Sequence, residues 1–253
     1  ADGYRAFLGL ASHEYFHLWN VKRIKPAAFV PYDLTQENYT RLLWAFEGFT
    51  SYYDDLMLVR SGLLTEKQYL ETLAKTLTVV LQRTSRLKQS IADSSFDAWI
   101  KYYRQDENAP NSVVSYYQKG SLVGLALDLT LRAETKGRVS LDDVMRALWK
   151  RARDGGADYT GVEEDEFVEV AEQVSGLALA RRLQEWTEGT RDPDFAALLA
   201  TVGIQFAARP AVDAPHFALL GVKTASSGTD CRLAHVFDGS PAQRAGLSAN
   251  DVL

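Results

Sequence analysis

The sequence predicts a mainly α-helical protein that ends in a short β-rich segment. Apolar residues recur at the spacing of helix faces through most of the chain as far as Gly203. After Gly203 this spacing is lost, and β-rich pieces follow, separated by a Ser-Ser-Gly turn signal. Of the 253 residues, 46% are hydrophobic and 24% are charged, which is typical of a globular protein with a proper core.

Three helices are predicted in the first part of the chain. Residues 4–19 have a broad apolar face, and prolines break the loop that follows them. Residues 37–60 form a second helix, which is rich in leucine and aromatic residues and is ended by a glycine. Thr65 and Gln68 have the spacing of a capping box, which begins a third helix over 65–87.

The middle of the chain is predicted to alternate between polar stretches and helices. Residues 88–114 are mixed and polar, and a long apolar helix is predicted over 116–134. Ser140 and Asp143 give another helix start. The remaining helices are predicted over 140–153, 162–175, 177–188 and 193–200.

Two domains are expected, with a boundary at the proline-containing linker 208–215. The helical domain covers 1–207, and the β-rich segment covers 216–253. Both ends of the chain lie inside predicted elements, so we expect a piece of a longer protein. Cys231 is the single cysteine, which excludes an intrachain disulfide.

The charge balance argues against two classes of partner. The formal net charge is -5 and the pI is near 5.5, whereas nucleic-acid-binding proteins usually carry a basic surplus. No uninterrupted apolar run reaches the ~18–20 residues that span a bilayer. We therefore expect neither a nucleic-acid partner nor a membrane span in this chain.

The segment His13-Glu14-Tyr15-Phe16-His17 has the pattern HExxH. Residues four apart lie on one face of a helix, so His13 and His17 can direct two imidazoles at one zinc ion. Glu14 is one residue further on, where its carboxylate can take a proton from a water that zinc activates. Half of the four histidines lie in this motif, which favours a zinc site over two unrelated surface histidines.

A third zinc ligand is predicted at Glu47, inside a strongly apolar helix. A carboxylate flanked by aromatic residues is costly to bury unpaired, and a metal offsets that cost. A place on the solvated face, or a salt bridge to Arg41 or Arg60, is the alternative. Asp54 and Asp55 follow two turns later as alternative ligands or, as we favour, as groups that hold a histidine N–H.

Hydrolysis of an amide also needs a donor for the developing oxyanion, and a tyrosine hydroxyl is a common one. Tyr116 and Tyr117 open the predicted apolar helix, where a side chain can face a cleft. The residue pattern is equally compatible with simple core packing of either tyrosine.

Three blocks of the sequence resemble the glycyl aminopeptidase family, which are zinc metallopeptidases of the gluzincin clan. The blocks are SHEYFHLWNVKRIKP (12–26), LWAFEGFTSYYDDL (43–56) and SYYQKGSLVGLALDL (115–129). They are also similar, more distantly, to blocks of the membrane-alanyl-type aminopeptidases. The resemblance extends over residues 1–205 and implies a mainly α architecture, the helical C-terminal half of a thermolysin-like catalytic domain.

By position, the resemblance implies His13, His17 and Glu47 as ligands of a Zn²⁺ cofactor. It implies Glu14 as the general base. It also implies that Tyr117, the tyrosine of a Tyr-x-Lys-Gly motif, stabilises the oxyanion, while the lysine and glycine of that motif are structural.

The C-terminal segment resembles part of a PDZ domain. Leu219-Leu220-Gly221-Val222 resembles the carboxylate-binding loop, and residues 235–253 resemble the segment that follows it, with Asn250 where glycine is usual. The resemblance implies the N-terminal part of a PDZ domain, which binds C-terminal peptides when complete. It also implies a β-rich region upstream of residue 1, whose Gly-rich motif holds the free amine of the substrate.

We therefore expect a zinc aminopeptidase that removes N-terminal Gly or Ala from peptides with a free N-terminus. A zinc endopeptidase is one alternative, and N-acetylated substrates would separate the two activities. The other alternative is a non-catalytic peptide-binding module with a structural zinc, which a fourth protein ligand would indicate.

Overall fold

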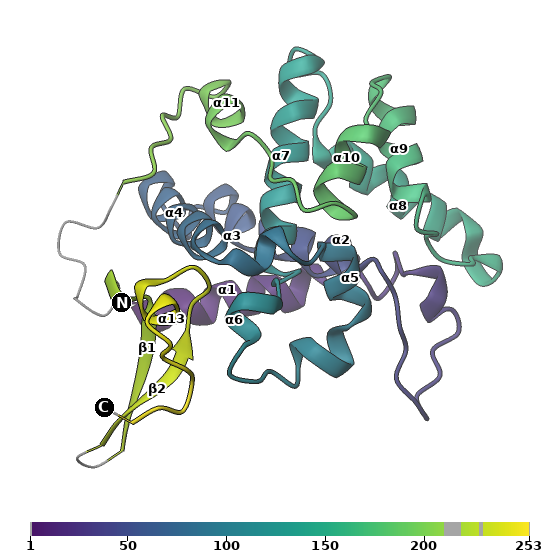
Figure 1. Cartoon of the computed structure of the whole chain (residues 1–253). Coiled ribbons are helices and arrows are strands. Elements are labelled where there is room, and N and C mark those ends of the chain that lie inside the picture. Colours follow the sequence, from purple (N-terminus) through teal and green to yellow (C-terminus); the bar gives the residue numbers. More distant parts are fainter. Residues whose placement is uncertain (1, 210–218, 228–229, 253) are drawn as a thin grey trace.

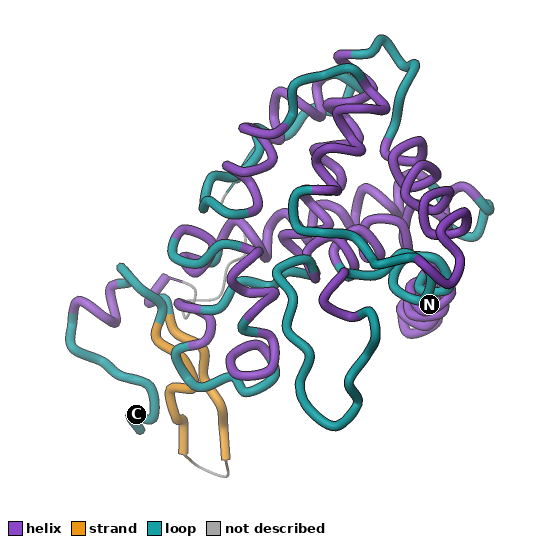
Figure 2. Tube along the Cα trace, turned by 90° about the vertical axis from the view of Figure 1, so that its right-hand side faces the viewer, coloured by secondary structure: helices purple, strands orange, loops and turns teal. Residues whose placement is uncertain are grey.

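The computed structural model describes residues 2–209, 219–227 and 230–252 (Figure 1). Most of these residues lie in helices, and a two-stranded sheet lies at one end of the molecule (Figure 2). The prediction of a mainly α protein is therefore confirmed. Among the described residues, no helix is both long and apolar enough to cross a membrane.

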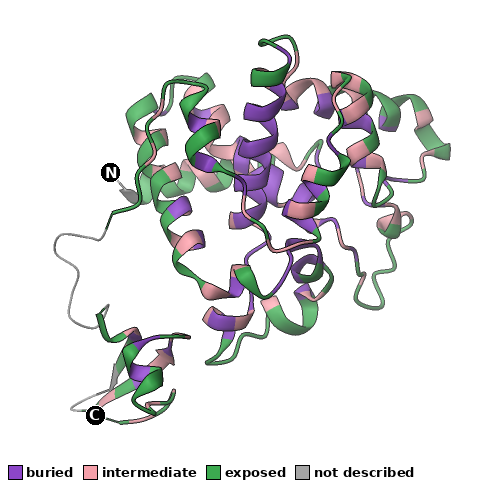
Figure 3. Ribbon diagram, turned by 45° about the horizontal axis from the view of Figure 1, so that its top comes forward, coloured by how far each residue is buried: buried purple, intermediate pink, exposed green. Residues whose placement is uncertain are grey.

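The core is built around α7 (Gln118–Glu134), in which every residue from Lys119 to Leu131 is buried (Figure 3). Helices that precede and follow it in the sequence pack against it. These are α2 (Leu43–Phe46), α3 (Gly48–Arg60), α4 (Glu66–Gln82), α8 (Leu141–Gly155), α10 (Ala180–Thr187) and α11 (Phe195–Ala200). Packed on those are α1 (Asp2–Phe16), α5 (Ile91–Phe96) and α9 (Glu166–Ser175), while α6 (Ala109–Ser112) packs on the 3-10 turn Thr84–Leu87 that follows α4.

The helix-start signals work as predicted at two positions. Thr65 and Gln68 form a reciprocal capping box, in which the side chain of each accepts from the backbone N–H of the other. The Asp143 carboxylate accepts from the backbone N–H of Ser140 at 2.9 Å. These bonds satisfy N–H groups that the first turn of a helix leaves without partners.

The prediction of a helix over 37–60 was wrong for the first part of this range. Helix begins only at Leu43, because side chains bond the backbone of the preceding loop: Asn38 accepts from the N–H of Asp33 and donates to its carbonyl, and Thr40 accepts from the N–H of Leu42. Such side-chain bonds compete with helix formation. The helix also breaks at Glu47, between α2 and α3. The 162–175 prediction was too long as well, since α9 begins at Glu166.

α3 and α7 cross with their backbones in contact at two glycines. A Cβ atom added to Gly48 would lie 2.6 Å from the Cα of Gly120, and one added to Gly120 would lie 2.7 Å from the carbonyl oxygen of Trp44. Real Cβ atoms are not found at such distances, so both positions require glycine. The crossing places Glu47, which precedes Gly48, close to Tyr117 at the start of α7.

The C-terminal segment is a hairpin with a small core of its own. β1 (Val222–Ser227) pairs antiparallel with β2 (Asp230–Val236), and α13 (Pro241–Arg244) follows. The apolar cluster of this part consists of Val222, Leu233, Val236 and Ala242, with Leu247 against it. The predicted linker 208–215 lies, from residue 210 on, outside the described residues.

The hairpin docks on the helical body through polar contacts. The Asn111 side chain donates to the carbonyl of Val236 at 2.8 Å and accepts from the N–H of Asp238 at 3.0 Å. His235 Nδ1 lies 2.9 Å from the carbonyl oxygen of Glu107. Lys88 forms an ion pair with Asp238. These contacts hold β2 against the segment around α6.

The apolar face predicted for the first helix is largely exposed. Tyr4, Phe7, Leu10 and Tyr15 are each at least 60% exposed, although Phe16 stacks on Tyr53 of α3 with ring centroids 4.7 Å apart. The opposite side of α1, which carries His13, faces α3 instead.

We predict that Gly48→Ala and Gly120→Ala each destabilise the protein by ~1–3 kcal/mol, the usual cost of forcing extra atoms into a packed core. Either methyl group would push α3 away from α7. The measurement is the denaturation midpoint with urea. Gly9→Ala in α1 is the matched control, because a Cβ there meets nothing within 4 Å. Gly9→Ala should leave the stability unchanged or raise it. An equal loss of stability in all three variants would show that the close helix crossing does not require glycine at positions 48 and 120.

Candidate metal centre

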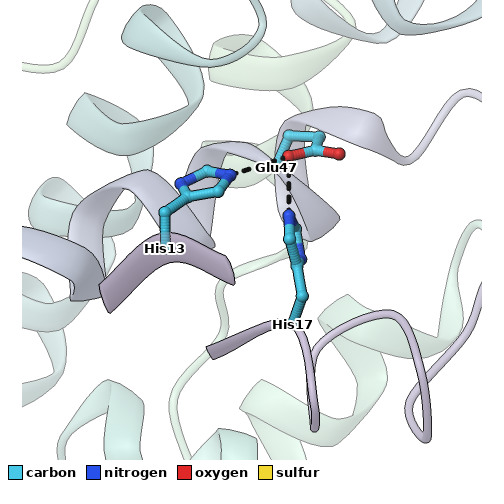
Figure 4. Close-up of side chains that lie close together, drawn as sticks. All are labelled: His13, His17 and Glu47. Carbon is cyan, nitrogen blue, oxygen red and sulfur yellow. Dashed lines mark hydrogen bonds and ion pairs between the residues drawn. The ribbon is translucent and has the colours of Figure 1, made fainter. Parts of the chain in front are cut away.

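Three side chains from two places in the sequence meet at one point (Figure 4). His13 lies in the last turn of α1, and His17 follows that helix with its N–H still bonded to the carbonyl of His13 at 3.2 Å. Glu47 lies at the break between α2 and α3. One carboxylate oxygen of Glu47, Oε2, is 3.2 Å from Nε2 of each histidine. The three donor atoms lie within 4.8 Å of one another.

This donor set fits a zinc ion. Zinc prefers nitrogen and carboxylate oxygen at about 2.0–2.2 Å in tetrahedral geometry, so two of its ligand atoms lie about 3.3 Å apart. The separation between each imidazole nitrogen and Glu47 Oε2 is 3.2 Å. Within the part of the chain that the structure describes, this is the group of residues able to hold a metal, and it offers three ligands.

The second ring nitrogen of each histidine is also engaged. Nδ1 of His13 lies 3.1 Å from a carboxylate oxygen of Asp54, on α3. Nδ1 of His17 lies 2.8 Å from the backbone carbonyl of Asn20. Metal-binding histidines in proteins usually donate this second N–H to a carboxylate or carbonyl, which directs the other nitrogen at the ion. Asp54 thus occupies the supporting position that we favoured for it, whereas Asp55 forms no hydrogen bond or ion pair with either histidine in the described part of the chain.

Asn20 is a functional candidate that the sequence analysis missed. Its buried amide donates to the carbonyls of Ala45 and Phe46 and to the hydroxyl of Thr50, at 3.1–3.2 Å. It thereby ties the end of the HExxH segment to the helix break beside Glu47. The signal was an amide next to a run of aromatic residues, since a buried amide needs partners.

The charges of the cluster favour a cation between its carboxylates. Burial lowers the pKa of His13, but hydrogen bonds to Asp54 and Glu47 outweigh it and raise that pKa to about 9. Burial also acts to raise the pKa of Glu47, but hydrogen bonds from the two imidazoles lower it overall. Burial raises the pKa of Asp54. A divalent ion would supply the positive charge that these carboxylates otherwise draw from protonated imidazoles.

Within the described residues, Glu47 forms no ion pair with Arg41 or Arg60, the alternative that the sequence left open. Arg41 bonds Asp93 at 2.9 Å, and Arg60 bonds Asp142 at 3.0 Å. Both arginines are therefore engaged elsewhere on the surface. The contacts of the Glu47 carboxylate are the two imidazoles, which is what a ligand role requires.

An open hollow of about 330 Å³ lies over the cluster, and Glu14 and Tyr117 line it together with the three candidate ligands. The side chain of Glu14 is on the exposed side of α1 and is free to reach into the hollow. The structure therefore brings all five predicted site residues to one place. Lys22, from the basic stretch after His17, lies on the rim.

The two neighbouring tyrosines have different positions. Tyr116 is fully buried in the core, whereas the ring of Tyr117 lies 6.3 Å from that of His13, measured between ring centroids. The hydroxyl of Tyr117 is 3.1 Å from that of Tyr103. Burial and the nearby charge of Glu47 raise the pKa of Tyr117, so its hydroxyl keeps the proton that it would donate.

Lys119, two residues further on, is buried away from the hollow. Its ammonium group lies 3.3 Å from Asp192 and 3.3 Å from the carbonyl oxygen of Arg86. Burial lowers its pKa. These contacts connect the start of α7, which carries Tyr117 just before it, to the loop before α11.

Comparison with known proteins identifies relatives of this chain. The family model of the M61 glycyl aminopeptidases matches residues 6–123. The crystal structure of an aminopeptidase N family protein from Idiomarina loihiensis superposes with a TM-score of 0.89 at 38% identity. That match covers 99% of this chain but 44% of the other, so the chain spans less than half the length of that protein. No match was found among curated proteins.

The family match covers both histidines of HExxH, Glu47 and Tyr117, and the structural match extends the likeness over the remaining helices and the hairpin. On these two findings, the chain belongs to the M61 glycyl aminopeptidase family.

Proposed function

We propose that this chain carries the catalytic zinc site of a peptidase. The observation that carries the proposal is the set of three donor atoms beside an open hollow, with Glu14 and Tyr117 on its walls. Catalytic zinc sites have three protein ligands and leave one position for water or substrate. His13, His17 and Glu47 would hold the ion.

The chain's own residues supply the remaining chemistry. Zinc bound there would act as a Lewis acid that makes a water molecule acidic and polarises the scissile carbonyl. Glu14 accepts the proton of the attacking water and then delivers it to the leaving amine. Tyr117 donates its hydroxyl hydrogen bond to the oxyanion that develops on the carbonyl oxygen. Asp54 and Asn20 keep the two imidazoles in the orientation that this chemistry needs.

A structural zinc in a binding module is the weaker alternative. Structural sites are closed by four protein ligands and are usually rich in cysteine. Among the described residues the metal-binding group has three members, and it borders a hollow instead of being enclosed. Cys231, the single cysteine, lies on β2 of the hairpin.

The finer assignments rest on the family resemblance. We propose that residues 1–207 are the helical half of a thermolysin-like catalytic domain and that 216–253 begin a PDZ domain. Asn250 supports the latter, because its φ of 76° is the left-handed conformation for which glycine is usual. The proposed substrate is a peptide with a free N-terminus and Gly or Ala as its first residue.

We predict that the chain binds one zinc ion and that Asp54→Asn weakens binding about 10- to 100-fold, the usual cost of removing such a supporting group. The measurement is competition with a chromogenic zinc chelator. Asp55→Asn is the matched control and should change little. Equal zinc affinity in the two variants would show that Asp54 does not support the zinc ligands.

We predict that Glu14→Gln retains zinc but loses hydrolysis of alanine or glycine anilides, because glutamine cannot accept the proton of the water. The parent protein should lose the same activity in a strong chelator and regain it with added zinc. Turnover by the glutamine variant at the parental rate would reject the role of general base.

We predict that Tyr117→Phe lowers kcat about 10²–10³-fold, the usual effect of removing one oxyanion donor, with little change in KM. Tyr116→Phe is the control, because that ring is buried in the core. The measurement is steady-state kinetics on the same anilides. A small effect at Tyr117 would assign the oxyanion to another donor.

A further inference from the structure

A second hollow lies between the C-terminal hairpin and the helical body, with a volume of about 850 Å³. We call it the hairpin cleft. One wall consists of the end of α4 with the residue after it, Arg83, and of the segment that leads into α7. The other wall consists of the hairpin, through Gly221, Lys223, His235 and Phe237.

The hairpin cleft shares a lining residue with the hollow over the candidate metal centre. Tyr117 lines both the hollow over His13, His17 and Glu47 and the hairpin cleft. A molecule whose reacting carbonyl lies beside Tyr117 is therefore next to a residue that also borders this second space. An aminopeptidase cleaves after the first residue of its substrate, so the rest of the peptide needs a space beside the metal centre.

The walls of the cleft are tied together. Asn111 bonds the backbone of the hairpin at Val236 and Asp238, and Lys88 pairs with Asp238. The backbone carbonyl of Glu107 holds the ring of His235, which lines the cleft. The hairpin is therefore docked in a position that keeps the cleft open beside Tyr117.

The charge of the cleft is opposite to that of the protein. The chain has a formal net charge of -5, yet the described residues that line the cleft include Arg83 and Lys223 and no aspartate or glutamate. No ion pair of Arg83 or Lys223 occurs among the described residues. Cations without counter-ions in a cleft raise the local concentration of anionic ligands.

We propose that the hairpin cleft binds the part of a peptide substrate beyond the scissile bond, with Arg83 and Lys223 pairing with a carboxylate on that part. The inference rests on the proposed peptidase function and adds a substrate class to it: peptides that carry a carboxylate after the first residue. That carboxylate is either the free C-terminus of a short peptide or an acidic side chain.

The test uses the zinc-loaded Glu14→Gln chain, which should bind substrate without turning it over. Isothermal titration compares tetra-alanine with a free C-terminus, its C-terminal amide, and Ala-Ala-Glu-Ala amide. Because exposed ion pairs contribute ~0.2–1 kcal/mol each, two such pairs should make the free acid bind about 2- to 30-fold more tightly than the amide. The glutamate peptide shows whether an acidic side chain can take the place of the C-terminus.

Charge-removing variants in the Glu14→Gln background then locate the carboxylate. The preference for the acid should fall in Arg83→Gln and in Lys223→Gln and disappear in the double variant. Lys150→Gln, at an exposed lysine of α8, is the matched control and should keep it. Lys22→Gln tests the other route, since Lys22 lines both the metal hollow and a neighbouring basic hollow.

The outcomes separate this inference from the proposed function. Four results would overturn the role of the cleft. The acid and the amide could bind equally, or neither could bind measurably. The preference for the acid could also survive in the double variant, or be lost only in Lys22→Gln. Hydrolysis of alanine p-nitroanilide by the parent chain, a substrate without a carboxylate, reports the peptidase function independently. Anilide cleavage with equal peptide binding rejects the cleft alone. A carboxylate preference without anilide cleavage rejects catalysis alone.

Discussion

The contact between α3 and α7 at Gly48 and Gly120 is the constraint on which the candidate site depends. Two helix backbones can approach this closely only where neither has a Cβ atom at the crossing. Glu47 directly precedes one glycine, and Tyr117 lies three residues before the other. A wider crossing would move the carboxylate away from the imidazoles and the hydroxyl away from the hollow, although none of these side chains takes part in the crossing.

The ligand cluster shows how a partly buried carboxylate is stabilised. Glu47 interrupts an apolar segment, and its one oxygen at equal distance from two imidazoles is stabilised by their hydrogen bonds. Asp54 and the carbonyl of Asn20 orient the same imidazoles from behind. The site is therefore preorganised by groups that do not touch the metal position, which is how proteins keep a metal geometry specific.

The C-terminal hairpin shapes the space beside the candidate metal centre. Its docking through Asn111 and Lys88 makes one wall of a cleft that begins at Tyr117. The segment buries little apolar surface by itself: among its described residues, the core consists of four buried residues with one partly buried neighbour. Contact with the helices thus supports the hairpin, while the hairpin shapes the space next to the metal centre.

By itself the sequence determined the helical class, two capped helix starts and the chemical types of the site residues. These features are local: periodicity, capping and the i, i+4 spacing of HExxH depend only on nearby residues. Only the tertiary structure decided that the helix breaks at Glu47, that the side chain of Tyr117 lines the same hollow as the three ligands, and that Asn20 links the two ligand segments. Each of these depends on contacts between residues far apart in the chain, which no local pattern encodes.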